Sequence, residues 1–110
     1  MRDIAWSDEG EYTAYLLAER RCMAWALEML GHLDPDAAAH FAKTMYLYES
    51  ADDPDRGAIF HDQAWHYAML RVFGEGYWQK HSDRLNPSTA YDDLWAATYE
   101  NSRKASRSSI

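Results

Sequence analysis

Apolar residues recur every three or four positions along most of the chain, which is the spacing of one face of an α-helix. Alternating apolar and polar stretches are absent, and valine occurs once, at Val72, so no strand is predicted. Between positions 8 and 30 the apolar face consists of Tyr12, Tyr15, Leu16, Cys22, Met23, Ala26, Leu27 and Leu30. Two further faces of this kind follow, and the whole pattern predicts an all-α protein.

Start and stop signals divide this pattern into four main helices. Asp34-Pro35 and Asp53-Pro54 each place a capping side chain before a proline at the first helical position. Glycines follow the first and third segments, where helices commonly end. The predicted helices span 8–30, 35–50, 54–73 and 88–102, with a short fifth helical segment within 77–85. Because the connections are short, neighbouring helices should be antiparallel, and we expect a compact up-and-down helical bundle.

Length and composition set the class of protein. A chain of 110 residues is long enough for one hydrophobic core. We expect a single domain over 1–102 and a polar, disordered tail over 103–110. There is no run of about 18 apolar residues, so no membrane span is expected, and the first residues lack the apolar stretch of a secretory signal. With Cys22 as its single cysteine, the chain is expected to be a reduced, cytoplasmic protein.

Charge narrows the choice of partner. The chain carries 18 acids against 11 lysines and arginines, and three of those bases lie in the last eight residues. Such an acidic body repels nucleic-acid backbones, so direct nucleic-acid binding is disfavoured. It complements a partner protein with a basic surface. The five tryptophans and eight tyrosines are residue types enriched in cores and at interfaces alike.

One short segment, "ESADDPDRG" over 49–57, gathers four acids: Glu49, Asp52, Asp53 and Asp55. Helix capping and the helix dipole account for two of them and leave the other two unexplained. We therefore predict that this segment is an acidic patch that contacts the basic partner. Aromatic residues outside the regular helices are the candidate apolar anchors of the same interface: Trp6, Tyr77 and Trp78.

Four polar residues fall on the apolar helix faces: Glu19, Glu49, Asp62 and His66. Burying a bare carboxylate costs several kcal/mol, so these groups need partners. One alternative is a metal site, since the set resembles the ligands of carboxylate-bridged sites in helical bundles, although the usual Glu-x-x-His pair is missing. The favoured interpretation is metal-free, with an Asp62–His66 hydrogen bond and Glu19 bound to a tyrosine hydroxyl. A third is that this face is an interface.

A second catalytic pattern rests on two residues. Arg56 and His61 have the Arg-x4-His spacing of the HEPN ribonucleases, which are also small helical bundles, and the sequence is similar to that family at these positions alone. Gly57 stands where the family usually has a polar residue. The resemblance implies an RNA substrate, which the acidic body disfavours.

Two functions are consistent with these observations. The first is a small, acidic, non-catalytic binding protein that docks on a larger basic protein, as an inhibitor or adaptor of the phage anti-defence or immunity type. It would use no cofactor and no catalytic residue, and a homodimer is compatible with it. The second is a metal-dependent or acid–base enzyme built on Glu19, Asp62 and His66. An enzyme needs an open cavity at those residues, whereas a binder needs a closed core and an adhesive surface.

Overall fold

The computed structural model describes residues 8–61, 63–84 and 86–108, with the backbone alone for His61 and 105–108. Within these ranges every regular element is helical and there is no strand, which confirms the all-α prediction. In chain order the elements are α1 (Glu9–Gly31), α2 (Pro35–Met45), the 3-10 turn η2 (Ala58–His61), α3 (Ala64–Phe73), α4 (Tyr77–Lys80), the 3-10 turn η3 (Ser82–Arg84) and α5 (Thr89–Ser108).

Local side-chain chemistry explains where the first two helices begin and end. Asp8 caps α1, because its Oδ1 accepts the Glu11 N–H at 3.1 Å. His32 closes α1 in the left-handed conformation, with φ of 57°. Asp34 then caps α2 by accepting the Asp36 N–H at 3.0 Å, with Pro35 at the first helical position, as predicted.

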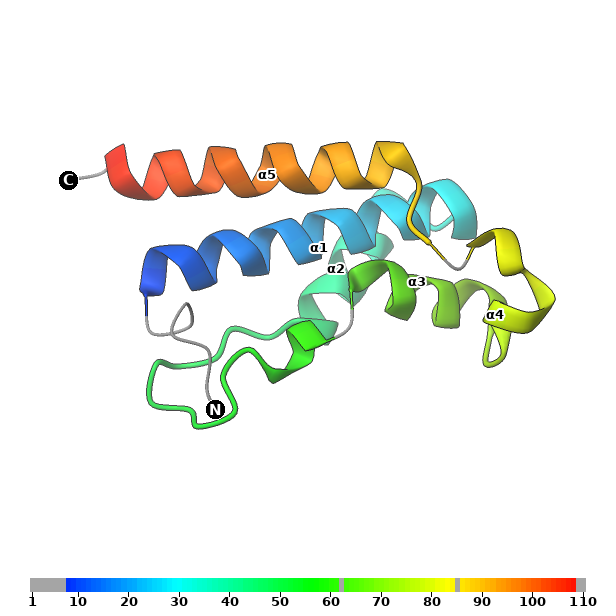
Figure 1. Cartoon of the computed structure of the whole chain (residues 1–110), viewed down its shortest axis with the longest axis horizontal. Helices are drawn as coiled ribbons and strands as arrows, with labels where there is room; N and C mark the ends of the chain where they lie inside the picture. The colour runs from blue at the N-terminus through cyan, green and yellow to red at the C-terminus, as the bar shows by residue number, and fades with distance from the viewer. Residues whose placement is uncertain (1–7, 62, 85, 109–110) are drawn as a thin grey trace.

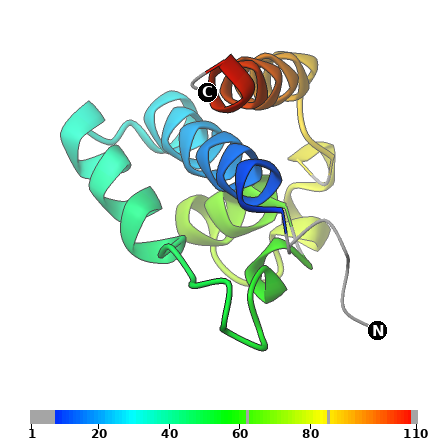
Figure 2. The same ribbon diagram turned by 90° about the vertical axis from the view of Figure 1, so that its left-hand side faces the viewer.

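The other three long helices, α2, α3 and α5, are arranged around α1. Figure 2 looks along the bundle and shows α1 in the centre, with α2, α3 and α5 on different sides of it. In Figure 1 α2 and α5 run opposite to α1, and α3 runs parallel to it, so direction alternates along the chain. Because α1 packs against all three of these helices, it is buried on more than one face. Ala14 and Ala18, outside the predicted apolar face, are at most 1% exposed.

Two predicted boundaries, the end of the second helix and the start of the third, were wrong. The second helix ends at Met45 instead of 50, and the third begins at Ala64 instead of 54. Between them the side chain of Asp53 accepts the Asp55 N–H at 2.8 Å, and Gly57 has φ of 84°. Side-chain to backbone bonds of this kind compete with helical ones, so the chain forms a loop and a 3-10 turn.

The fourth long helix is longer than predicted. It continues to Ser108, past the predicted end at 102. Arg103 Nη1 lies 3.2 Å from Oε1 of Glu100 within α5, and its Nε lies 3.5 Å from Oε2 of Glu11, so α5 is tied to α1 just past the predicted end. The segment also contains no proline or glycine that would interrupt a helix.

Length alone would allow two of the helices to reach across a bilayer. α1 has 23 residues and α5 has 20, and about 20 apolar residues are needed. Both are too polar for such a span, and no other helix in the described ranges meets the requirement either.

Candidate functional site

The predicted acidic patch lies on the loop over 46–57, which joins α2 to η2 and is drawn at the lower left of Figure 1. Asp52 and Asp55 are exposed, whereas Glu49 and Asp53 are partly buried. The two partly buried acids hold the loop: Glu49 Oε1 accepts the Gly57 N–H at 2.9 Å, and Asp53 accepts the Asp55 N–H. Two acids therefore shape the loop, and the other two face solvent.

A buried arginine fastens this loop to the start of α1. Arg56 is 2% exposed, and its Nη2 lies 2.5 Å from Oε1 of Glu9. The guanidinium carbon lies 3.8 Å from the ring centroid of Tyr12, within the range of a cation–π contact. The Tyr12 hydroxyl accepts the Glu49 N–H at 2.8 Å. The hydrogen bond from Tyr48, together with that from Arg56, holds the pKa of Glu9 below its ordinary value, so Glu9 remains a carboxylate at neutral pH.

Beside the acids the loop exposes two large apolar side chains. Leu47 is 65% exposed and Tyr48 is 54% exposed. The Tyr48 hydroxyl donates to Glu9 Oε2 at 2.5 Å, and its ring meets Tyr12 edge-on at 5.6 Å. Tyr48 is therefore held in place while one face stays open. A hollow of about 440 Å³ opens here, lined by Met45, Leu47, Tyr48, Glu49, Ser50, Asp53 and Ile59.

The two predicted aromatic anchors that the structure describes lie away from this surface. Trp6 lies outside the described residues. Tyr77 is 2% exposed and belongs to the core, where its hydroxyl is 2.8 Å from Nδ1 of His66. Trp78 is 42% exposed, but α4 lies at the opposite end of the long axis from the loop (Figure 1).

A second site lies in the interior, where Glu19 of α1 meets α3 and α5. Glu19 is 1% exposed, as its position on the apolar face predicted. Its predicted tyrosine partner was wrong: the Trp95 indole Nε1 donates to Oε2 at 2.9 Å, and the backbone N–H of Ala64 also donates to the carboxyl. Burial raises the pKa of Glu19 to about 7, although these two hydrogen bonds lower it in part.

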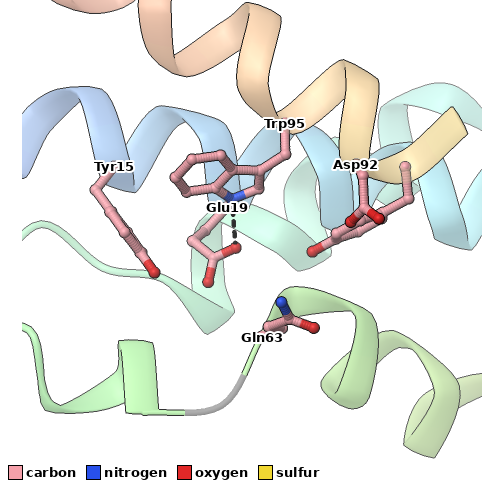
Figure 3. A pocket seen from close by; sticks show the side chains of 6 residues that line it. Tyr15, Glu19, Gln63, Asp92 and Trp95 are labelled. Atoms are coloured by element: carbon pink, nitrogen blue, oxygen red, sulfur yellow. Dashed lines mark hydrogen bonds between the residues drawn. The ribbon is translucent and has the colours of Figure 1, made fainter. Parts of the chain in front are cut away.

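This carboxyl forms the floor of a pocket, drawn in Figure 3. The pocket has a volume of about 260 Å³. Exposed Gln63 and Asp92 stand at its rim, and buried Tyr91 joins Glu19 at the floor. The remaining described lining residues are Tyr15 and Trp95, both half-buried.

The same groups explain how α3 begins. Its N-cap, Gln63, makes no side-chain capping bond. Glu19 instead receives the N–H of Ala64, and the Tyr91 hydroxyl receives the N–H of Trp65 at 3.0 Å. Because the first N–H groups of a helix lack partners within it, side chains from α1 and α5 supply the cap. Glu19 thus fixes three helices together.

The remaining candidate residues that the structure describes do not assemble into a centre. Asp62 lies outside the described residues, so its predicted bond to His66 is untested. The observed partner of His66 is Tyr77. Glu49 belongs to the loop at the other site. Within the described residues no three acids, histidines or cysteines come close enough to hold a metal ion.

Two further candidate catalytic residues, Arg56 and Cys22, are too buried to reach a substrate. Arg56 of the Arg-x4-His pattern lies under the loop at 2% exposure, and the side chain of His61 is not described. Cys22 is fully buried, and burial raises the pKa of its thiol to about 12. A buried thiol of high pKa is a poor nucleophile.

Sequence reasoning missed Leu47, Tyr48 and Trp95 as site residues. Because the predicted second helix reaches position 50, it includes Tyr48, and the exposure of that side chain was not predicted. The signal available was the pair Leu47-Tyr48 directly before an acid-rich turn. Nothing in the sequence alone marks Trp95 as the partner of Glu19, since 76 positions separate them.

Comparisons with known proteins add no family or fold relative. No protein-family model matches the chain, and neither a curated protein nor a solved structure does so.

Proposed function

We propose that this protein is a non-catalytic binding protein that docks on a basic surface of a larger protein through the loop over 46–57. The observation that carries the proposal is the exposure of Leu47 and Tyr48 beside the acids of the loop. Protein–protein interfaces commonly have large apolar side chains at a central hot spot and charged residues at the surrounding rim.

The hollow beside Tyr48 suits a particular kind of side chain. Its lining combines apolar walls with the carboxylates of Glu49 and Asp53. Arginine and lysine carry a long apolar stem that ends in a positive charge, so either can place its stem on Leu47 and its charge near the acids. Exposed Asp52 and Asp55 would then steer a basic partner toward the loop.

The rigidity of the loop also favours binding. Arg56, Tyr12 and Glu49 already fix its backbone in the free protein. A pre-organised loop loses less conformational entropy on association than a flexible one. The surface therefore needs no folding step before it can bind.

The size and sign of charge fit one class of binder in particular. Inhibitors of nucleic-acid-handling enzymes, among them phage-encoded anti-defence proteins and toxin-neutralising immunity proteins, are small and acidic because their targets are basic. We place the protein with this inhibitor or adaptor class, acting in the cytoplasm on a protein partner rather than on nucleic acid. A homodimer is compatible with this arrangement.

One observation favours the second candidate, an acid–base enzyme. Glu19 has a pKa of about 7 and lines a pocket. A carboxyl with such a pKa suits proton transfer near neutral pH. His66, which the same hypothesis assigned to this site, is not among the described residues of the lining, and Asp62 lies outside the described residues.

Affinity capture with matched baits tests the proposal. The baits are the wild-type chain, the double variant Asp52→Lys/Asp55→Lys, and the control Glu75→Lys/Asp93→Lys, which makes the same charge change at exposed positions outside the loop. We expect the wild type and the control to retain a partner with a basic surface that the loop variant loses. Retention by all three baits, or loss by both variants, would contradict docking through this loop.

A further inference from the structure

We propose that the pocket between α1, α5 and the start of α3 is a binding site for a small organic cation, with an ammonium or guanidinium group. This site is separate from the docking loop, and its ligand is a small molecule rather than a protein. The geometry that carries the inference is two carboxyl groups and three aromatic rings around one opening, with Glu19 at the floor and Asp92 at the rim.

The chemistry of the lining selects for positive charge. No lysine or arginine belongs to the described lining, which consists of Tyr15, Glu19, Gln63, Tyr91, Asp92 and Trp95. Aromatic rings attract cations through their negative faces, and tryptophan does so most strongly. The helix dipole places a partial positive charge of about +0.5 at the start of α3, which opposes cation binding. Glu19 already offsets this charge, because it accepts the Ala64 N–H there.

Glu19 is also a buried carboxyl without a cationic partner. Its bonds come from neutral donors, the Trp95 indole and the Ala64 amide, and none of the ion pairs between described residues includes it. Buried carboxylates are usually paired with a positive group. A cationic ligand in the pocket would supply that missing partner.

The volume limits the ligand to a small molecule. Pockets for drug-sized ligands measure about 300–1,000 Å³, and this one measures about 260 Å³. A short alkylammonium or alkylguanidinium ion matches this scale: its alkyl part would lie against Tyr15 and Trp95, and its charged group between the two acids.

Binding should depend on pH through Glu19. The titratable groups that face it are Tyr15 and Cys22 of α1, Tyr46 after α2, and Tyr91 of α5. Burial raises the pKa of each, and the negative charge of Glu19 raises it further. Asp92 stands at the rim. The raised pKa values keep the three tyrosines and the Cys22 thiol neutral near neutral pH, so protonation of Glu19 is what changes the charge at the floor. The cation should therefore bind best above the pKa of about 7.

Nuclear magnetic resonance with n-butylammonium as the probe tests the inference, and 1-butanol serves as the neutral control. The signals to follow are the Trp95 indole N–H and the Ala64 amide, since both donate to Glu19. At about pH 8 we expect saturable shifts of both signals with butylammonium and none with butanol. At about pH 5.5 Glu19 is mostly protonated, and the affinity should fall by at least about tenfold.

A pair of neighbouring variants supplies the matched control. Asp92→Asn removes the rim charge and should weaken binding by about fivefold, as expected for one partly screened charge pair. Asp93→Asn removes the adjacent exposed acid, which does not line the pocket, and should leave affinity unchanged. The inference is overturned if no saturable shift occurs, if butanol binds equally, or if both variants weaken binding alike.

Discussion

Replacing Glu19 by glutamine should make the protein more stable at alkaline pH and leave it nearly unchanged in acid. Glutamine keeps an oxygen that can accept from Trp95 and Ala64, but it carries no charge to bury. The pKa of Glu19 is raised by burial from its ordinary value of 4.5 to about 7 in the folded chain. Between these two values the folded state keeps a proton that the unfolded state releases, so the free energy of unfolding falls as pH rises.

The magnitude can be worked from that shift. Each pKa unit corresponds to about 1.36 kcal/mol, so a rise from 4.5 to about 7 costs the wild type on the order of 3 kcal/mol above pH 7. Below about pH 4.5 both states are protonated and the cost disappears. The Glu19→Gln variant should therefore match the wild type near pH 4 and exceed it by up to about 3 kcal/mol near pH 8.

Urea denaturation followed by circular dichroism at several pH values measures this difference directly. Subtracting the wild-type free energy from that of the variant cancels the groups that titrate in both proteins. Asp93→Asn, which removes an exposed acid outside the pocket, serves as the control and should show no such trend. A difference between Glu19→Gln and wild type that stays constant from pH 5 to pH 8 would refute the buried, ionising carboxyl.

Three further outcomes are expected. Trp95→Phe removes the indole donor to Glu19, so it should destabilise by about 1–3 kcal/mol and make stability fall more steeply with rising pH, as urea denaturation would show. Cys22 should react with a thiol reagent only when the chain unfolds, since it is buried and its pKa is about 12; a labelling rate independent of denaturant would count against this. Arg56→Lys loses the planar group over the tyrosine ring. Hydrogen exchange at the Gly57 amide should then speed up, and unchanged protection would show that the arginine does not hold the loop.

The fold could be predicted because its signals are local. Asp34-Pro35 predicts a capped helix from residues that are neighbours in the sequence, and the structure confirms this helix start. Asp53-Pro54 is the same pair of residues, yet no α-helix follows it directly. The Asp53 side chain instead accepts the Asp55 N–H and forms a turn. The residues after each proline make the difference: the run of alanines after Pro35 favours a helix, whereas Gly57 with φ of 84° does not.

The candidate sites were harder to predict because they depend on packing between distant segments. Periodicity placed Glu19 on a buried face, which was confirmed. Its partner Trp95 comes from a helix 76 positions away, and no spacing rule reaches that far. Exposure of Leu47 and Tyr48 likewise depends on where α2 stops, and helix ends are the least certain feature of a periodic pattern.

The loop over 46–57 is central to the proposed function, as the docking surface for a basic partner. The most direct test is the association rate of a captured partner with the wild type and with Asp52→Lys/Asp55→Lys, at low and at high salt. Because exposed charges mainly accelerate encounter and salt screens them, the wild type should associate at least about fivefold faster at low salt. The variant should lose this advantage while its circular dichroism spectrum stays unchanged. Association rates that are independent of both salt and the two substitutions would contradict the docking mechanism.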